Sequence, residues 1–229
     1  MQSNNAKRAM VIVAHPDDAE LGAGGFIARL AQKGFEIRYI ICTNGNKGTK
    51  DSNLSPHKLA EIREVEQREA AKVLGVSSIL FLRHEDGDLE PNKAFRMELA
   101  ILIREFQPET IITHDPWRHY LIHPDHRAVG ITVMDAIVSA RDHLFLPVAG
   151  FLGFEAWAPR EIFFTFPENP DYYEDISETM EIKLKATSQH LSQIGSFQNW
   201  ENNIKNRARE LGKAKGFPYA EAYKRVELH

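Results

Sequence analysis

Residues 10–25 read MVIVAHPDDAELGAGG, and the rest of the chain is organised around this stretch. It begins with five apolar residues, 10–14, and then changes abruptly to His15 and Pro16. An apolar run bounded by a turn is typical of a buried strand. Asp17 and Asp18 complete the turn, and a helical pattern follows. A histidine and two carboxylates at the end of a buried strand indicate chemistry as well as a chain reversal.

The composition excludes several classes of protein. The 229 residues are 43% hydrophobic, which is enough for one core, and we predict one domain over residues 1–229. The net charge of -4 and the absence of a Lys/Arg block argue against a nucleic-acid partner. One cysteine, Cys42, excludes an intramolecular disulfide. Residues 144–166 are broken by Pro, Gly and charges, and no signal-type segment opens the chain, so we expect a cytoplasmic protein without a membrane span.

The apolar periodicity alternates between strand and helix along the first half of the chain. Strands are predicted at 10–14, 36–42, 78–82 and 110–113, and helices at 20–33, 58–74 and 95–106. Beyond them we predict a helix at 127–141, a strand at 161–166, a helix at 177–195 with Ser177 as its N-cap, and a charged, partly helical tail. This order predicts an α/β fold with a mostly parallel sheet and helices on both faces.

The polar residues cluster after the first and the fourth predicted strands. In such sheets ligands bind beyond the carboxyl ends of the strands where the strand order reverses, and these two strands usually flank that point. The first loop carries residues 15–18, and the second carries His114, His119 and the run 123–126, HPDH. Two histidines and one carboxylate form a typical catalytic zinc set with water in the open position. The sequence therefore predicts a metal site built from both loops, with a further carboxylate available as a base.

Simpler explanations exist for the individual residues. Asp17 and Asp125 could each cap a helix, and His114 or His119 alone could be an ordinary loop residue. Capping does not explain the histidines that adjoin both aspartates, so we favour the metal site. The glycines of residues 22–25 follow the acidic turn and do not form a GxGxxG loop between strand and helix. We expect them to permit close helix packing or to keep a pocket open, without a nucleotide.

The segment AHPDDAELG at 14–22, followed by HPDH at 123–126, resembles the PIG-L/LmbE-type zinc-dependent N-acetylglucosaminyl deacetylases. Weaker similarity lies at 43–45, where Asn44 replaces a frequent Asp, and in residues 63–75, 183–193 and 219–221. The resemblance covers nearly the whole chain. It implies a Rossmann-like α/β fold that binds no nucleotide.

The resemblance also implies roles for eight side chains and for one metal ion. The ion would be Zn²⁺, one per chain, or another divalent metal. The metal ligands would be His15, Asp18 and His126; the catalytic residues Asp17, His123 and Asp125; and the substrate-binding residues Arg63 and Asn44. Asp17 would be the general base, His123 would stabilise the oxyanion or donate a proton, and Asp125 would orient His123.

The implied activity is hydrolysis of the N-acetyl group of an N-acetylglucosamine-containing small molecule or glycoconjugate by a metal-activated water. Homo-oligomers are frequent in the family, and we expect one here. Two alternatives stay open: a metal-dependent hydrolase of another amide or ester, and a non-enzymatic metal-binding protein. A separate base favours hydrolysis over iron-based oxygen chemistry. Residues 46–56, 84–92 and 118–122 are expected to shape the pocket rim, and Trp117, Tyr120 and Trp157 to contact a sugar or to pack.

Overall fold

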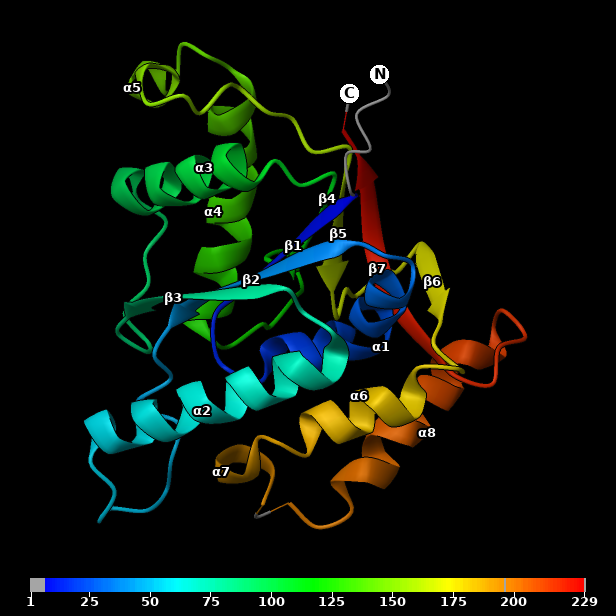
Figure 1. Cartoon of the computed structure of the whole chain (residues 1–229). Helices are drawn as coiled ribbons and strands as arrows, with labels where there is room; N and C mark the ends of the chain where they lie inside the picture. Colours follow the sequence, from blue (N-terminus) through cyan, green and yellow to red (C-terminus); the bar gives the residue numbers. More distant parts are fainter. Residues whose placement is uncertain (1–6, 196, 229) are drawn as a thin grey trace.

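The computed structural model describes residues 7–195 and 197–228, and its centre is a seven-stranded sheet (Figure 1). The strand order is β3-β2-β1-β4-β5-β7-β6. The strands are β1 Arg8–Val13, β2 Glu36–Thr43, β3 Ser78–His84, β4 Thr110–His114, β5 Glu161–Thr165, β6 Tyr172–Asp175 and β7 Ala220–Glu227. Strands β1 to β5 pair in parallel, whereas β7 is antiparallel to both of its neighbours. The predicted α/β class with a mostly parallel sheet is confirmed.

Helices cover both faces of the sheet (Figure 1). They are α1 Asp18–Gln32, α2 Pro56–Leu74, α3 Lys93–Phe106, α4 Pro124–Arg141, α5 Pro147–Phe151, α6 Met180–Thr187, α7 Leu191–Ile194 and α8 Trp200–Lys213. Helices α3 and α4 pack on one face, and α1, α2 and α6 on the other. Among the described residues, no helix combines the length and apolarity needed to cross a membrane.

Strand β1 is buried on both of its faces, which explains its uninterrupted apolar sequence. Met10 and Ile12 belong to the core beneath α3 and α4. Val11 and Val13 belong to the core beneath α1 and α2. Because successive side chains of a strand point to opposite faces, a strand between two helical layers needs apolar residues at every position.

The sheet reverses its order between β1 and β4. From β1 the chain proceeds outward through β2 to β3, and from β4 it proceeds the other way to β5. The loops that follow β1 and β4 therefore meet at one point of the carboxyl edge, as the sequence predicted. Helices α1 and α4 begin directly after these loops.

The C-terminal part differs from the sequence prediction. The predicted helix 177–195 is two short helices, α6 and α7, separated by residues 188–190. Ser177 is not its N-cap: its hydroxyl donates to Asp175 Oδ1 at 2.6 Å, and Thr179 is the residue before α6. Strands β6 and β7 were not predicted. The charged sequence of β7 adopts a strand because it pairs with β5 and β6, and local residue pattern does not report such pairing.

Candidate functional site

The loops after β1 and β4 bring together the side chains of His15, Asp18 and His126. His15 Nδ1 lies 3.1 Å from His126 Nε2 and 3.2 Å from Asp18 Oδ2. The other oxygen of Asp18, Oδ1, lies 3.2 Å from His126 Nε2. Tetrahedral ligands about 2.0–2.1 Å from an ion are about 3.3 Å from one another. The three side chains thus fit a metal ion in both donor chemistry and spacing.

The second nitrogen of His15 faces carboxylates on the opposite side of the ring. Its Nε2 lies 3.0 Å from Asp125 Oδ2. Asp125 also accepts the backbone N–H groups of Gly87 at 2.7 Å and Leu89 at 3.1 Å, so its position is fixed. A carboxylate behind a metal-binding histidine sets the tautomer and the ring orientation. The expectation that Asp125 orients His123 is corrected: its hydrogen bond goes to His15.

Asp86 also joins this cluster, although the sequence analysis did not single it out. It follows β3, which lies at the edge of the sheet, but its loop returns to the site. Asp86 Oδ1 lies 3.2 Å from His15 Nε2 and 4.0 Å from His123 Nε2. The sequence did carry one indication of this role: Asp86 is a carboxylate that comes just after a parallel strand, inside the acidic segment 84–92.

His114, the last residue of β4, forms the wall behind His126. The two rings stack at 4.2 Å with an interplanar angle of 10°. His114 Nε2 accepts the backbone N–H of Ala14 at 3.1 Å and lies 3.3 Å from Asp18 Oδ2. Burial lowers its pKa. His119, in contrast, is exposed and binds Glu168 at 2.6 Å, outside the cluster.

The charges of the cluster favour a cation at its centre. Burial alone would lower the pKa of His15, but hydrogen bonds to Asp125, Asp18 and Asp86 raise it to about 11. Burial alone would raise the pKa of Asp18, but His126 and His114 hold it well below its usual value. The carboxylates therefore stay ionised at neutral pH. A site that stabilises positive charge this strongly also suits a divalent metal ion.

Asp17 stands next to these donors in a strained backbone conformation. Its φ is 104° and its ψ is -27°, which is rare for any residue except glycine. Its side chain makes no capping hydrogen bond to α1, so capping does not explain it. Burial raises the pKa of Asp17 to about 6, against the opposing effect of Arg63. The Asp17 carboxylate therefore lies in the same turn as His15 and Asp18, and it does not cap helix α1.

A buried polar chain holds the backbone of Asp17. Its N–H donates to Gln67 Oε1 at 2.9 Å, and Gln67 Nε2 donates to Glu20 Oε1 at 2.9 Å. Glu20 Oε2 lies 3.1 Å from His190 Nε2. Gln67, Glu20 and His190 are each 0% exposed. His190 lies just before α7 and is the last member of this chain of contacts. Buried hydrogen-bond networks of this kind restrict the movement of the backbone that they hold.

Arg63 connects the turn after β1 to the turn after β2. Its Nη2 donates to Pro16 O at 2.6 Å and its Nη1 to Gly45 O at 2.8 Å, while Nη2 lies 3.4 Å from Asp17 Oδ2. Gly45 has φ +63°, and a Cβ there would lie 2.6 Å from the Arg63 guanidinium. Glycine is therefore required at this contact. Asn44 has a local contact, since its Oδ1 accepts the N–H of Asn46 at 3.1 Å.

His123 stands at the open side of the cluster. Its ring lies 4.4 Å from that of His15, and its side chain is 42% exposed. Within the described residues its Nδ1 is buried without a hydrogen-bond partner. The nearby His15 and His126 and, above all, burial lower the pKa of His123.

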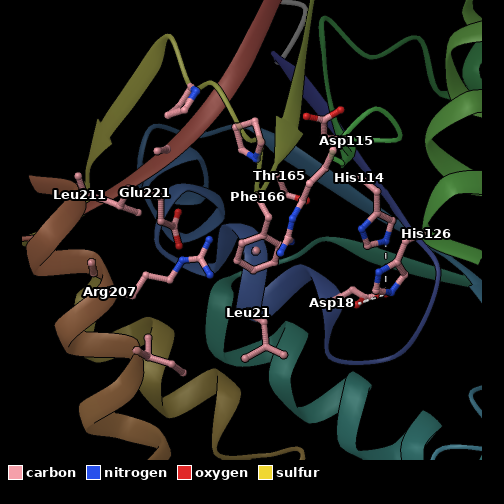
Figure 2. A pocket seen from close by; sticks show the side chains of 18 of the residues that line it. Asp18, Leu21, His114, Asp115, His126, Thr165, Phe166, Arg207, Leu211 and Glu221 are labelled. Atoms are coloured by element: carbon pink, nitrogen blue, oxygen red, sulfur yellow. Dashed lines mark ion pairs between the residues drawn. The ribbon is translucent and has the colours of Figure 1, made fainter. Parts of the chain in front are cut away.

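A cavity of about 520 Å³ opens onto the metal donors and continues past Phe166 towards α8 (Figure 2). Asp18, His114 and His126 line one end, and Arg207 and Leu211 the other. Trp157 is far from this space, since it packs in the core and donates to Pro108 O at 2.7 Å. Neither Trp117 nor Tyr120, both exposed, is among the residues that line it.

Comparison with known proteins agrees with this geometry. The family model PIG-L, described as GlcNAc-PI de-N-acetylase, matches residues 10–137. Diacetylchitobiose deacetylase from Thermococcus kodakarensis is 34% identical over 97% of this chain and 84% of its own length. A probable N-acetyl-alpha-D-glucosaminyl L-malate deacetylase 2 from Bacillus cereus is 29% identical over 88% of this chain and 90% of its own.

A solved structure gives the same result for the fold. The N,N'-diacetylchitobiose deacetylase of Pyrococcus horikoshii, complexed with its inhibitor MPG, aligns with a TM-score of 0.92 and 33% identity. The alignment covers 97% of this chain and 85% of that one. The family match includes both the AHPDD turn and the HPDH run, the two motifs that carried the resemblance. The chain belongs to the PIG-L family of GlcNAc-PI de-N-acetylases.

Proposed function

We propose that this chain is a zinc-dependent hydrolase that removes the N-acetyl group from an N-acetylglucosamine-containing small molecule or glycoconjugate. One observation carries the proposal: the side chains of His15, Asp18 and His126 lie 3.1–3.2 Å apart. The Asp17 carboxylate belongs to the same turn, and Asp18 and His126 line a cavity. The named activities of the relatives support the same class of substrate. A pure storage site would be expected to saturate the ion with protein ligands and to need no extra base.

The donor set would hold the ion through His15, Asp18 and His126, with Asp125 orienting His15 from behind. A bound Zn²⁺ supplies Lewis acidity and lowers the pKa of a water ligand from about 15.7 to about 7. The binding of one such ion per chain fits the charge of the cluster, because its carboxylates stabilise a cation at that place.

The side chains have two tasks in this reaction: Asp17 transfers a proton, and His123 stabilises the negative charge that develops on the carbonyl oxygen. Asp17 accepts a proton from the attacking water and returns it to the departing amine as the C–N bond breaks. His123 donates a hydrogen bond to the carbonyl oxygen as negative charge develops there. The products are acetate and a free amino sugar. Arg63 keeps the Asp17 turn in place, and its contact with substrate, like that of Asn44, stays a prediction.

The location, the domain organisation and the oligomeric state of the protein are proposed together with its activity. We infer a cytoplasmic enzyme that folds as one domain and assembles as a homo-oligomer. The composition supports the first two statements, and the family resemblance supports the third. Sedimentation of the purified protein measures its oligomeric state, and a purely monomeric species would overturn the last point.

The test is acetate release from a panel of N-acetylglucosaminides by the zinc-loaded protein. We expect release from at least one compound, its loss after chelation, and its return with Zn²⁺ but not with Mg²⁺, which prefers oxygen ligands. No acetate from any N-acetylglucosaminide by the loaded protein would contradict the proposal. Parallel assays with other amides and with phosphoesters would then identify an alternative hydrolase.

A further inference from the structure

The far end of the cavity has no role in the hydrolysis described above. Figure 2 shows Phe166 between the metal donors and this far end, where Arg207, Leu211 and Glu221 line the wall. A volume of about 520 Å³ lies within the usual range of roughly 300–1,000 Å³ for small-ligand pockets. The cavity therefore has room for a substituent beyond the sugar that carries the acetamide.

Two guanidinium groups, those of Arg118 and Arg207, line this cavity, and Figure 2 shows Arg207 at its far end. Arg118 comes from the loop between β4 and α4, and Arg207 comes from α8. In the part of the chain that the structure describes, neither guanidinium forms an ion pair. Burial, and then the nearby Arg118, lower the pKa of Arg207, so the two cations are close enough to repel each other. An anion between them would relieve that repulsion.

The carboxylates near this end are already engaged. Glu221 accepts a hydrogen bond from Lys183 Nζ at 2.6 Å, and Glu168 binds His119 at 2.6 Å. In Figure 2 the carboxylate of Asp115 points away from Phe166. The positive charge of the two guanidinium groups is therefore left for a ligand.

The ring of Phe166 packs against the guanidinium group of Arg207. The guanidinium carbon of Arg207 lies 4.5 Å from the centre of the Phe166 ring. Phe166 has φ +51°, a left-handed conformation that is strained for a bulky side chain. A guanidinium stacked on a ring keeps the N–H groups at its edge free, and their fork matches a carboxylate or a phosphate.

Resting on the deacetylase function proposed above, we propose that the preferred substrate carries a carboxylate or phosphate on the part remote from its acetamide group, and that Arg118 and Arg207 bind this anion. The metal end then holds the acetyl group, and the guanidinium end selects the molecule that bears it. A neutral N-acetylglucosaminide would be a substrate, but a poorer one.

The experiment compares neutral and anionic acetamido sugars with the zinc-loaded enzyme. The phosphate arm uses N-acetylglucosamine 1-phosphate and 6-phosphate against methyl N-acetylglucosaminide. The carboxylate arm uses an N-acetylglucosaminide of glycolic acid against its methyl ester. In at least one arm we expect the anionic compound to have a kcat/KM higher by about tenfold or more, as charge-assisted hydrogen bonds allow. The arm that shows this preference identifies the anion.

Variants connect the preference to the residues. Arg207→Gln and Arg118→Gln should each reduce the anionic-to-neutral ratio of kcat/KM by about tenfold, whereas Arg207→Lys should retain part of it. Arg209→Gln is the matched control, because Arg209 lies on the same helix and donates to Asn206 Oδ1 and the Tyr219 hydroxyl. A ratio near one in the wild type, or a ratio that neither Gln variant changes, would overturn the proposal.

Calorimetric binding of the deacetylated anionic and neutral sugars separates this proposal from the function on which it rests. Acetate release without any preference for anionic substrates would support the deacetylase function and overturn the proposed anion site. Anion binding that Arg207→Gln weakens, in a protein that releases no acetate, would support the anion site and overturn the deacetylase.

Discussion

The two ends of the cavity are built in opposite ways. At the metal end, buried or half-buried histidine and aspartate side chains lie within 3.3 Å of one another, and each has a partner in the segments that follow β1, β3 or β4. Elsewhere on the cavity wall, Arg118 and Arg207 keep part of their surface exposed, and neither has an ion-pair partner among the described residues. A preorganised end suits a fixed reaction, and an open, charged end suits recognition of a ligand that completes it. The reaction and the choice of substrate are thus assigned to separate elements of one fold.

The largest effect should come from removing a metal donor. In His15→Ala, Asp18 and His126 lose the third member of their set, and we expect the dialysed protein to lose its metal. Acetate release should fall at least about a thousandfold, because the loss includes the electrostatic stabilisation of the transition state. Elemental analysis and the acetate assay measure both. His119→Ala is the control, since that exposed histidine lies outside the cluster.

Full metal content in His15→Ala would contradict the donor assignment. The comparison of the two ends would then fail as well, since the buried cluster would have only a structural role.

Asp17→Asn should separate catalysis from metal binding at the same end. The variant keeps all three donors, so we expect wild-type metal content. Loss of the general base should lower kcat by about 10²- to 10⁴-fold. Steady-state kinetics at saturating zinc measures this change. Turnover close to that of the wild type would reject Asp17 as the base.

The sequence was sufficient to predict that His15, Asp18 and His126 lie together, because these residues sit in two short motifs. In a parallel sheet, the position of a loop after a strand follows from strand order, so the sequence alone places His15 beside His126. Asp86 could not be placed in the same way. It follows an edge strand, and only the path of its loop returns it to His15. The resemblance implied that Asp125 orients His123, but in the structure its carboxylate lies 3.0 Å from His15 Nε2, a contact that depends on how the rings are oriented.

The guanidinium end could not be predicted from the sequence. Arg207 is one of several charged residues on α8, and nothing in the local pattern distinguishes it from Arg209. Its position over Phe166 depends on how α8 packs, and the neighbouring wall includes β7, a strand whose charged sequence resembles a solvated tail. Contacts between elements far apart in the chain, rather than residue type, define this end of the cavity.

Asp125→Asn should have an intermediate effect and tests the corrected role of this residue. If Asp125 orients His15, the variant should bind metal about 10- to 100-fold more weakly, as expected for the carboxylate behind a metal-binding histidine. At saturating zinc much of the activity should return. Competition with a chelator of known affinity measures the metal binding. Unchanged metal affinity with a low kcat at saturating zinc would instead favour the original assignment, in which Asp125 orients His123.

The smallest effect is expected at the guanidinium end. Phe166→Leu removes the ring beneath Arg207 but keeps an apolar side chain of similar length. An exposed cation–π contact contributes about 0.5–1 kcal/mol, so KM for the preferred anionic substrate should rise by about two- to fivefold. Phe151→Leu is the matched control, because Phe151 is 91% exposed on α5 and does not line the cavity. A weaker affinity for zinc in Phe166→Leu would show that the two ends are coupled, and it would contradict their assignment to separate tasks.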